Sequence, residues 1–333
     1  MKHSHNTSSP SRSVPTYSPS ETWERNLDFL KQLSILTAAY DVTLTLQGLK
    51  PDGSLQLCLT LEQADSRNVG AICWNNFFDT HGEEFSASYL NACEGGDLHT
   101  TVCKMAWPDL SWNTGCTDRK IADEIGYRNF SYRDMAKRLG HGTNYCGTPR
   151  TMASHSKVEV RVIEEFQRNY FNAFPSIPAW HGWVKDELKE LSYLKTLLGR
   201  RRYFFGRWDD KKNLRDAVAY SPQSMTADQI DTGLLQLWRE NRTQNLLQVH
   251  DSILVQFPEE EEDELIPWAL DLLRVDTLLK HDRPFHVPIG VKTGWNWGDH
   301  DPKNPDGLTS WKGSDPRIRT VPVGGKKFSL WEM

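Results

Sequence analysis

The stretch from Leu246 to Pro258, LLQVHDSILVQFP, constrains the fold most, because two apolar runs flank a single His-Asp pair. Both runs are rich in the residue types that favour β-strands. We therefore predict two short strands joined by a tight turn at His250-Asp251-Ser252. A carboxylate held at such a tip can bind a divalent cation, since Mg²⁺ prefers a few hard oxygen ligands on a rigid mount. An ordinary polar turn is the alternative interpretation.

The size and composition indicate a globular protein. The chain has 333 residues, of which 38% are hydrophobic, with 13 Trp and 13 Phe, and so many aromatic side chains require a sizeable core. No apolar run approaches the roughly 18 residues that span a bilayer, and no secretory leader opens the chain. We therefore expect an intracellular protein with no membrane partner. The six cysteines lack the close pairs typical of zinc sites, so we expect free thiols.

Charge is unevenly distributed along the chain. The net charge of −5 does not indicate a nucleic-acid-binding protein as a whole. Residues 195–215 are nevertheless strongly basic, which suits a phosphate-binding face. The acidic run Glu259 to Glu264 is interpreted as the solvated start of a helix.

The first third of the chain is expected to alternate between helix and strand. Residues 1–20 are rich in Ser, Pro and Thr, which favours disorder. The apolar spacing predicts a helix over 21–40, and alternation predicts a hairpin over 42–61. A helix should follow near Glu62, with Glu62 and Asp65 in its first turns. Asp97 is a candidate N-cap for a helix beginning at HTTVCKMAW.

A polar stripe is predicted on a helix spanning Tyr132 to Gly147. Arg133, Lys137, His141 and Tyr145 recur every four residues, so a helix places all four side chains on one face. Such a stripe is either an ordinary solvated surface or a functional face. In the second case the two cations offer a phosphate site and the phenol offers a stacking ring.

The second half of the chain is expected to be mainly helical until the His-Asp stretch. Residues 170–180 are interpreted as an aromatic and proline connector, followed by a helix over 183–193 and a basic strand or hairpin with turns at Gly199 and Gly206. A helix over 214–238 should be interrupted near Ser221-Pro222. A further helix is predicted over 267–279, and an irregular segment rich in Gly, Pro and Asp follows.

Five blocks in this order resemble the polymerase core of family A DNA polymerases, the class of bacterial DNA polymerase I and several phage replicases. The resemblance runs from about Leu57 to Trp297. In chain order the blocks are TLEQADSR, GGDLHT, RDMAKRLGHGTNYCG, PQSMTAD and VHDS. The first is similar to the phage-like form of the first palm motif, the third to the fingers helix, and the last to the second palm motif.

The resemblance implies an α+β fold. It consists of a palm with a small antiparallel sheet and a mainly helical fingers subdomain, without thumb or exonuclease domains. The implied organisation is a disordered leader (1–20), an N-terminal helix and strand (21–50), the first part of the palm (51–75), the fingers (76–215), and the second part of the palm with a C-terminal tail (216–333).

The resemblance also implies two catalytic Mg²⁺ ions, for which Mn²⁺ can substitute. Asp251 would be a ligand to both ions, with the backbone carbonyl of Leu61 and the position of Thr60 completing the protein's share. His250 would support the primer end. The chemistry would be in-line attack of a primer 3′-oxygen on an α-phosphorus.

The nucleotide and DNA contacts are implied in the same way. Arg133 and Lys137 would bind the β and γ phosphates of a dNTP, with Lys137 also donating a proton to pyrophosphate. His141 would lie against the new base and sugar, Tyr145 at the template base, and Asp65 at the sugar 2′ position. The residues implied in contact with primer-template DNA are Arg215, Gln223, His250, Arg200 and Arg201.

This sequence departs from the family pattern at Thr60, where the family has a metal-binding Asp. A neutral hydroxyl is a poor replacement for a carboxylate. Loss of the carboxylate ligand should lower the rate by on the order of 10³-fold. Glu62 and Asp65 are nearby, although both are expected on the following helix. Ser252 in place of Glu is a milder change. The expected function is a DNA-templated DNA polymerase core.

The alternative is an inactive or truncated polymerase-fold protein that binds primer-template DNA or forms part of a split polymerase. A separate thumb, exonuclease or processivity subunit would then be a partner. The phage-like motif favours a phage or prophage gene expressed in the bacterial cytoplasm.

Overall fold

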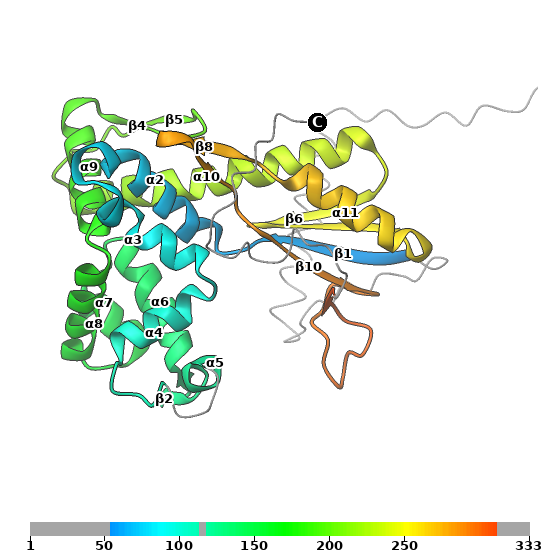
Figure 1. The fold of residues 1–333 in the computed structure, drawn as a ribbon, viewed down its shortest axis with the longest axis horizontal. Coiled ribbons are helices and arrows are strands. Elements are labelled where there is room, and N and C mark those ends of the chain that lie inside the picture. Colours follow the sequence, from blue (N-terminus) through cyan, green and yellow to red (C-terminus); the bar gives the residue numbers. More distant parts are fainter. Residues whose placement is uncertain (1–53, 113–117, 312–333) are drawn as a thin grey trace, which may run out of the picture. The chain divides into compact units, whose positions relative to one another are not determined.

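A five-stranded antiparallel sheet carries both Thr60 and Asp251 (Figure 1). The structure, a computed structural model, describes residues 54–112 and 118–311, all within the compact unit Gly48–Met333. The strand order is β11-β10-β1-β7-β6. The bounds are β1 Ser54–Leu61, β6 Gln244–Val249, β7 Ser252–Pro258, β10 Ile289–Gly294 and β11 Thr309–Ser310. The small antiparallel sheet of the predicted fold class is therefore confirmed.

Strand β1 lies in the interior of the sheet because both of its faces are apolar. Leu57, Leu59 and Leu61 point to one face and are fully or almost fully buried. They share a core with two helices, α10 (Lys211–Glu240) and α11 (Glu262–Leu273). On the opposite face Cys58 packs with Leu254 and Leu308. Because successive residues of a strand alternate between faces, Thr60 lies on the same face as Cys58, away from α10 and α11.

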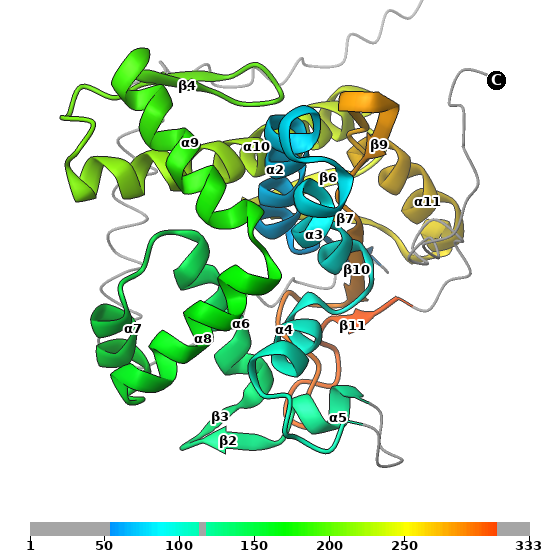
Figure 2. The same ribbon diagram turned by 60° about the vertical axis from the view of Figure 1, so that its left-hand side comes forward.

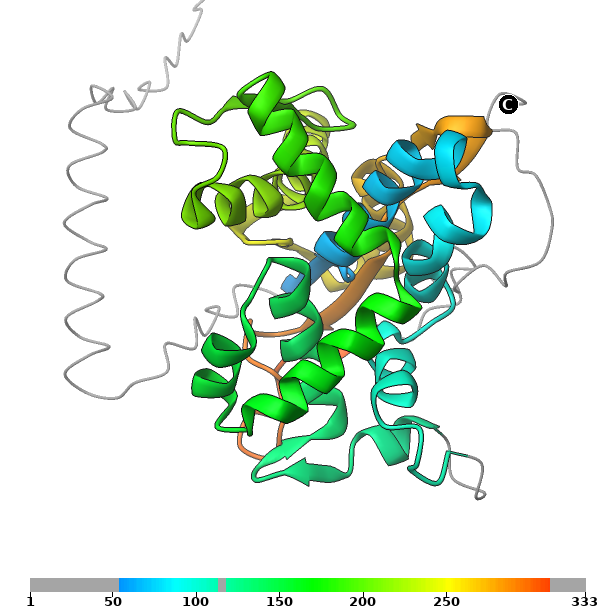
Figure 3. The ribbon, with the colours of Figure 1, turned by 90° about the vertical axis from the view of Figure 1, so that its left-hand side faces the viewer.

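Helices α2 to α9, the first half of α10 and two hairpins form a second core among the described residues (Figure 2). Large apolar side chains such as Met135, Ile163, Tyr170 and Trp180 fill it. Helices α6, α7, α8 and α9 pack in succession, and Figure 3 shows α8 and α9 in green. The helices are α2 Ala64–His81, α3 Glu83–Glu94, α4 Leu98–Ala106, α5 Asp118–Ala122, α6 Tyr132–Asn144, α7 Pro149–Ser156, α8 Val160–Ala173 and α9 Ser176–Glu190.

Helix α2 contributes side chains to both cores. One face of α2 contributes Val69 and Ile72 to the helical core, and another contributes Ala71 and Trp74 to the sheet core. Helix α2 therefore connects the two cores.

Three two-stranded hairpins and two 3₁₀ turns complete the described elements. The hairpins are β2 Ile125–Tyr127 with β3 Phe130–Ser131, β4 Tyr193–Lys195 with β5 Arg201–Tyr203, and β8 Thr277–Leu279 with β9 Arg283–Phe285; the 3₁₀ turns are Glu259–Glu261 and Lys280–Asp282.

The predicted interruption near Ser221-Pro222 is wrong, because α10 runs through Pro222 as one helix with a total length of 30 residues. A proline in a helix interior removes one backbone hydrogen bond and costs roughly 3 kcal/mol. Packing offsets that cost, since Ser221 and Met225 on either side are buried. The carbonyl of Pro222 also accepts hydrogen bonds from Asn68 Nδ2 at 3.3 Å and Thr226 Oγ1 at 3.1 Å.

Two further boundaries differ from the prediction. The connector predicted over 170–180 is mostly helix, because α8 ends at Ala173 and α9 begins at Ser176. Pro178 falls in the first turn of α9, where backbone N–H groups have no helical partner in any case. The helix predicted over 267–279 is instead α11, which starts at Glu262 and ends at Leu273, whereas Thr277–Leu279 is strand β8.

Several other predictions can be compared directly. LQLCLTL forms a strand, the acidic run starts α11, and the helix predicted from Tyr132 is α6. The leader, the helix over 21–40 and the first strand of the hairpin over 42–61 lie outside the described residues. Five of the six cysteines are described, and these five are free thiols. Within the described ranges no helix is long and apolar enough to cross a membrane.

Candidate functional site

The turn between β6 and β7 places Asp251 beside the end of β1. The turn consists of His250 and Asp251, and His250 adopts a left-handed backbone with φ of 55°. Ser252 pairs directly with Thr60, and the backbone N–H of Leu61 donates to the carbonyl of Asp251 at 2.9 Å. Directly paired residues in an antiparallel sheet lie about 5 Å apart. The structure therefore brings together the predicted metal-binding positions, with His250 exposed at their edge.

A chain of two hydroxyl groups connects Thr60 to the Asp251 carboxylate. Thr60 Oγ1 lies 2.8 Å from Ser252 Oγ, which donates to Asp251 Oδ1 at 3.3 Å. Neither hydroxyl carries a negative charge, so Asp251 supplies the only carboxylate among these three hydrogen-bonded side chains. In the described parts of the protein, no group of three or more His, Cys, Asp or Glu side chains is arranged to hold a metal ion.

Asp65, in the first turn of α2, is fully engaged by two other elements. The Tyr145 hydroxyl donates to Asp65 Oδ2 at 2.8 Å, and Thr226 Oγ1 donates to Asp65 Oδ1 at 2.8 Å. Tyr145 is the C-cap of α6, and Thr226 lies on α10. Asp65 thereby joins the segment that follows Thr60 to the end of the α6 stripe. It does not take part in the hydroxyl chain at Asp251.

The predicted stripe on α6 exists, and its N-terminal half forms an ion pair. Helix α6 starts at Tyr132 because the Ser131 hydroxyl caps it, accepting from the backbone N–H of Asp134 at 3.0 Å. Arg133 makes a two-pronged contact with Asp97, with Nε to Oδ2 at 2.7 Å and Nη2 to Oδ1 at 3.0 Å. One turn further on, Lys137 is exposed to solvent.

Asp97 has two roles in this region. It is the predicted N-cap of α4, accepting from the backbone N–H of His99 at 3.3 Å and the Thr100 hydroxyl at 2.7 Å. Burial alone would raise its pKa, but the hydrogen bonds from Arg133 and Thr100 outweigh burial and lower the pKa to about 2. Arg133 is therefore fixed by a carboxylate that stays ionised across the physiological range.

His99 is a member of this region that the sequence reasoning did not identify as a site residue. Its ring lies 6.1 Å from that of His141 on α6. Burial, together with the nearby positive charge of Arg133, lowers the pKa of His99 to about 4. Burial also lowers the pKa of His141. The signal that could have found His99 was the GGDLHT block, which places it next to Asp97.

The predicted DNA-contacting residues of α10 lie at the other end of the α6 stripe. The exposed Gln223 hydrogen-bonds to Tyr145, which lowers the pKa of that phenol, although burial and the adjacent Asp65 raise it more strongly. Arg215 is exposed two turns earlier on α10. Burial raises the pKa of the Cys146 thiol, directly after Tyr145, to about 11, and the positive charge of Arg215 partly offsets that rise. Gln223 and Arg215 thus both lie around the C-terminal end of α6.

Arg200 and Arg201 lie on a separate hairpin. Gly199, with φ of 94°, makes the turn between β4 and β5, a conformation that other residues rarely adopt. Arg200 Nε donates to Asp228 Oδ1 on α10 at 2.8 Å, and Arg201 lies over the ring of Tyr193 at 4.8 Å. The hairpin packs on α9 and α10, not in the sheet that holds Asp251. Just beyond it, Phe205 is 97% exposed.

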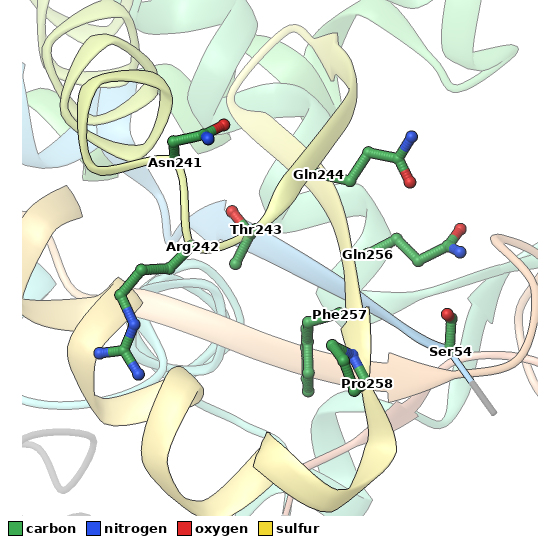
Figure 4. Close-up of a pocket in the computed structure, with 8 residues that line it drawn as sticks. All are labelled: Ser54, Asn241, Arg242, Thr243, Gln244, Gln256, Phe257 and Pro258. Carbon is green, nitrogen blue, oxygen red and sulfur yellow. The ribbon is translucent and has the colours of Figure 1, made fainter. Parts of the chain in front are cut away.

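A polar pocket lies at the opposite end of the β6–β7 hairpin from Asp251 (Figure 4). The register places Gln244 opposite Gln256 there, whereas Val249 pairs with Ser252 beside the turn. At about 3.4 Å per residue, the four steps along the strand from Ser252 to Gln256 span about 14 Å. The pocket is therefore distinct from the candidate site. Its lining residues are Ser54, Asn241, Arg242, Thr243, Gln244, Gln256, Phe257 and Pro258.

Comparisons with known proteins identify relatives of this chain. The profile of DNA polymerase family A matches residues 121–299. The thermostable DNA polymerase I of Thermus filiformis is 25% identical over 210 residues, which cover 61% of this chain and 23% of that protein. DNA polymerase I of Geobacillus stearothermophilus is 31% identical over 143 residues, covering 40% and 16% respectively. The chain thus matches about a quarter or less of the length of these curated relatives.

A solved structure has a similar fold. It is the POL domain of Pol1 from M. smegmatis in complex with DNA primer-template and dNTP, with a TM-score of 0.57 and 20% sequence identity. The match covers 74% of this chain and 41% of that one. At this level of identity the likeness concerns the fold.

Proposed function

This chain belongs to DNA polymerase family A, and we propose that it adds dNTPs to a primer 3′ end as the palm and fingers core of a DNA-templated DNA polymerase. One observation carries the proposal. The Tyr145 hydroxyl bonds to Asp65 at 2.8 Å, which joins the α6 stripe to the chain segment directly after Thr60. Thr60 in turn lies beside Asp251. Sequence blocks that are far apart in the chain thus meet around one site.

The α6 stripe is suited to a triphosphate. Lys137 is exposed, and Arg133 one turn earlier is held in a fixed orientation by Asp97. Positive charge and hydrogen-bond donors on a rigid helix favour phosphate oxygens. In this proposal Arg133 and Lys137 bind the β and γ phosphates, and Lys137 also protonates the leaving pyrophosphate. His141 and Tyr145 contact the nascent base pair, and Asp65 lies at the sugar.

The primer-template would lie along α10 and the basic hairpin. Gln223 and Arg215 surround the C-terminal end of the α6 stripe, and His250 is exposed beside Asp251. Arg200 and Arg201 would reach the DNA backbone from the β4–β5 hairpin. The Pol1 structure with the similar fold was solved with DNA primer-template and dNTP, which supports the same partners here. Its bacterial relatives support a bacterial setting, and a phage or prophage origin stays a prediction.

The metal requirement of this chemistry fits only part of the site. Two divalent cations, Mg²⁺ or Mn²⁺, would supply stabilisation of the attacking and leaving oxygens when bound. Asp251 and the carbonyl of Leu61 are oxygen donors of the right kind. The Thr60 hydroxyl is not, because it is neutral and already hydrogen-bonded to Ser252. A further carboxylate is needed for the full donor set.

Primer extension by the full chain tests this proposal. With Mg²⁺ or Mn²⁺, the wild type should extend a primed template, and Asp251→Ala should reduce the rate by on the order of 10³-fold or more. DNA affinity, measured by fluorescence anisotropy, should change little in Asp251→Ala, since the carboxylate is assigned to metal binding. Extension by the Asp251→Ala variant at the wild-type rate would contradict the proposal.

A second candidate function is favoured by the Thr60–Ser252 hydrogen bond. In that bond two neutral hydroxyl groups meet at the position where the family pattern has a metal-binding Asp, as expected for an inactive protein that binds primer-template DNA or for one part of a split polymerase. If only Thr60→Asp extends the primer, and the wild type binds DNA without extending it, this second function becomes the better account.

A further inference from the structure

We propose that Glu62 supplies the carboxylate that Thr60 lacks, so that Glu62 and Asp251 together hold the divalent cations. The inference rests on the proposed two-metal function. It concerns a residue that lies outside the strand and has no metal-binding role in the family pattern considered above. Four observations support it, and each involves contacts around the end of β1.

First, Thr60 and the two residues that pair with it lie in a row on one face of the sheet. Thr60 pairs with Ser252 of β7 on one side and with Gly290 of β10 on the other. Directly opposed residues in antiparallel strands have their side chains on the same face. Ser252, Thr60 and Gly290 therefore form a row across three neighbouring strands, with Asp251 at one end of it.

Second, Glu62 lies on this face. It is two residues after Thr60, and the intervening Leu61 points into the core with 2% exposure. The backbone N–H of Glu62 donates to the carbonyl of Pro288 at 2.8 Å, which fixes Glu62 beside the start of β10. Glu62 itself lies in the turn after β1, before the helix in which it was expected, and its carboxylate lies beside Gly290, on the face of the sheet that carries Thr60.

Third, the carboxylate of Glu62 occupies the space that a side chain at position 290 would take. A Cβ atom added to Gly290 would lie 2.6 Å from Glu62 Oε1 and 3.1 Å from its Cγ. Because Gly290 is the neighbour of Thr60 in the ladder, the Glu62 carboxylate lies about one strand spacing, roughly 5 Å, from the row position of Thr60. The absence of a side chain at Gly290 is what leaves room for this carboxylate.

Fourth, Asp65, the other acidic residue nearby, already accepts hydrogen bonds from other side chains. Both oxygens of Asp65 accept hydrogen bonds, from Tyr145 and Thr226. Glu62 is exposed and its carboxylate is directed along the sheet. Of the two acids that follow β1, only Glu62 can turn toward Asp251 without breaking contacts that join α2, α6 and α10.

The available span agrees with this donor set. The row from β10 to β7 covers two strand spacings, about 9–10 Å. Oxygen ligands at about 2 Å from two Mg²⁺ ions, themselves about 3.5–4 Å apart, are separated by up to about 8 Å. A rotation of the flexible Glu62 side chain closes the difference.

Binding of Mn²⁺ to the full chain, followed by electron paramagnetic resonance, tests the inference without relying on activity. Glu62→Gln and Asp251→Asn should each weaken Mn²⁺ binding at least tenfold. Thr60→Asp introduced into Glu62→Gln should restore binding. Glu260→Gln, in the acidic run at the far end of β7, is the matched control and should bind as the wild type does.

The outcomes separate this inference from the proposed function. Mn²⁺ binding that depends on Asp251 but not on Glu62 would overturn the inference and leave the polymerase proposal standing. Wild-type binding no stronger than that of Asp251→Asn would also overturn it. Binding that requires Glu62, in a chain that fails to extend primers, would support the metal site and refute the polymerase activity. Thermal unfolding followed by circular dichroism should show all variants folded, since Glu62 is exposed.

Discussion

The two ends of the candidate site differ in how their charges are satisfied. Around α6, Arg133 is bound to Asp97 through two hydrogen bonds, and Asp65 accepts two more from Tyr145 and Thr226. At the tip of the β6–β7 hairpin, a hydroxyl chain through Ser252 leads to a single carboxylate. The proposed phosphate end is built from fixed charges, whereas the proposed metal end has a hydroxyl where the family pattern has a second carboxylate.

The departure from the family pattern at Thr60 leaves the backbone at the end of β1 in the sheet. The register of β1 with β7 and β10 continues through Thr60, so the strand end has kept its place in the sheet. The contact between Tyr145 and Asp65 is likewise intact. Three predictions test how far the two ends are independent.

The largest expected effect is on acid stability, through His99. Its pKa is about 4 in the folded protein, against about 6.5 in an unfolded chain. The unfolded state therefore binds the proton first, and stability is lost as the pH falls from about 6.5 to about 4. At 1.36 kcal/mol per pKa unit, the loss is about 3 kcal/mol.

His99→Gln should remove this loss. Urea unfolding of wild type and variant at pH 7 and pH 4 measures it. His250→Gln is the control, because its side chain is exposed at the hairpin tip. An unchanged pH dependence in His99→Gln would show that protonation of His99 does not cause the loss of stability at low pH.

The next effect concerns Lys137. Lys137→Ala should lower kcat/KM for the dNTP by roughly 10- to 100-fold, about 1.4–2.7 kcal/mol, because the proposed function assigns Lys137 to a phosphate contact and to proton donation. The Kd for primer-template DNA should stay within about twofold. Arg138→Ala removes a neighbouring cation that lies over Phe130, 4.6 Å from the ring centre, and should affect neither quantity. Equal losses in dNTP use and DNA binding would contradict the assignment.

The smallest effect concerns the link between the two ends. Tyr145→Phe removes only the hydroxyl that donates to Asp65, so the free energy of unfolding should fall by about 1 kcal/mol. Equilibrium unfolding in urea measures this change, with Tyr203→Phe, on an exposed ring, as the control. No change in Tyr145→Phe would show that the hydrogen bond does not hold α6 to α2.

Local sequence signals predicted the elements that carry the site. The alternating strand before Thr60, the turn at His250-Asp251, the cap at Asp97 and the four-residue spacing on α6 all depend on neighbouring residues. Elements stabilised by tertiary packing were predicted less well. Helix α10 continues through Pro222 because its flanking residues are buried, and that burial cannot be read from the local sequence.

The sequence by itself determined the family, the order of its blocks, and the substitution of a hydroxyl for a carboxylate at Thr60, since these depend only on which residues occur and at what spacing. The tertiary structure decided which of the two acids after β1 is already held by hydrogen bonds. Asp65 is held by Tyr145 and Thr226, which come from distant parts of the chain. Glu62 is directed to the open space at Gly290 on a neighbouring strand. Hydrogen-bond partners and steric space arise only when separate segments pack together, so only the folded chain distinguishes the two carboxylates.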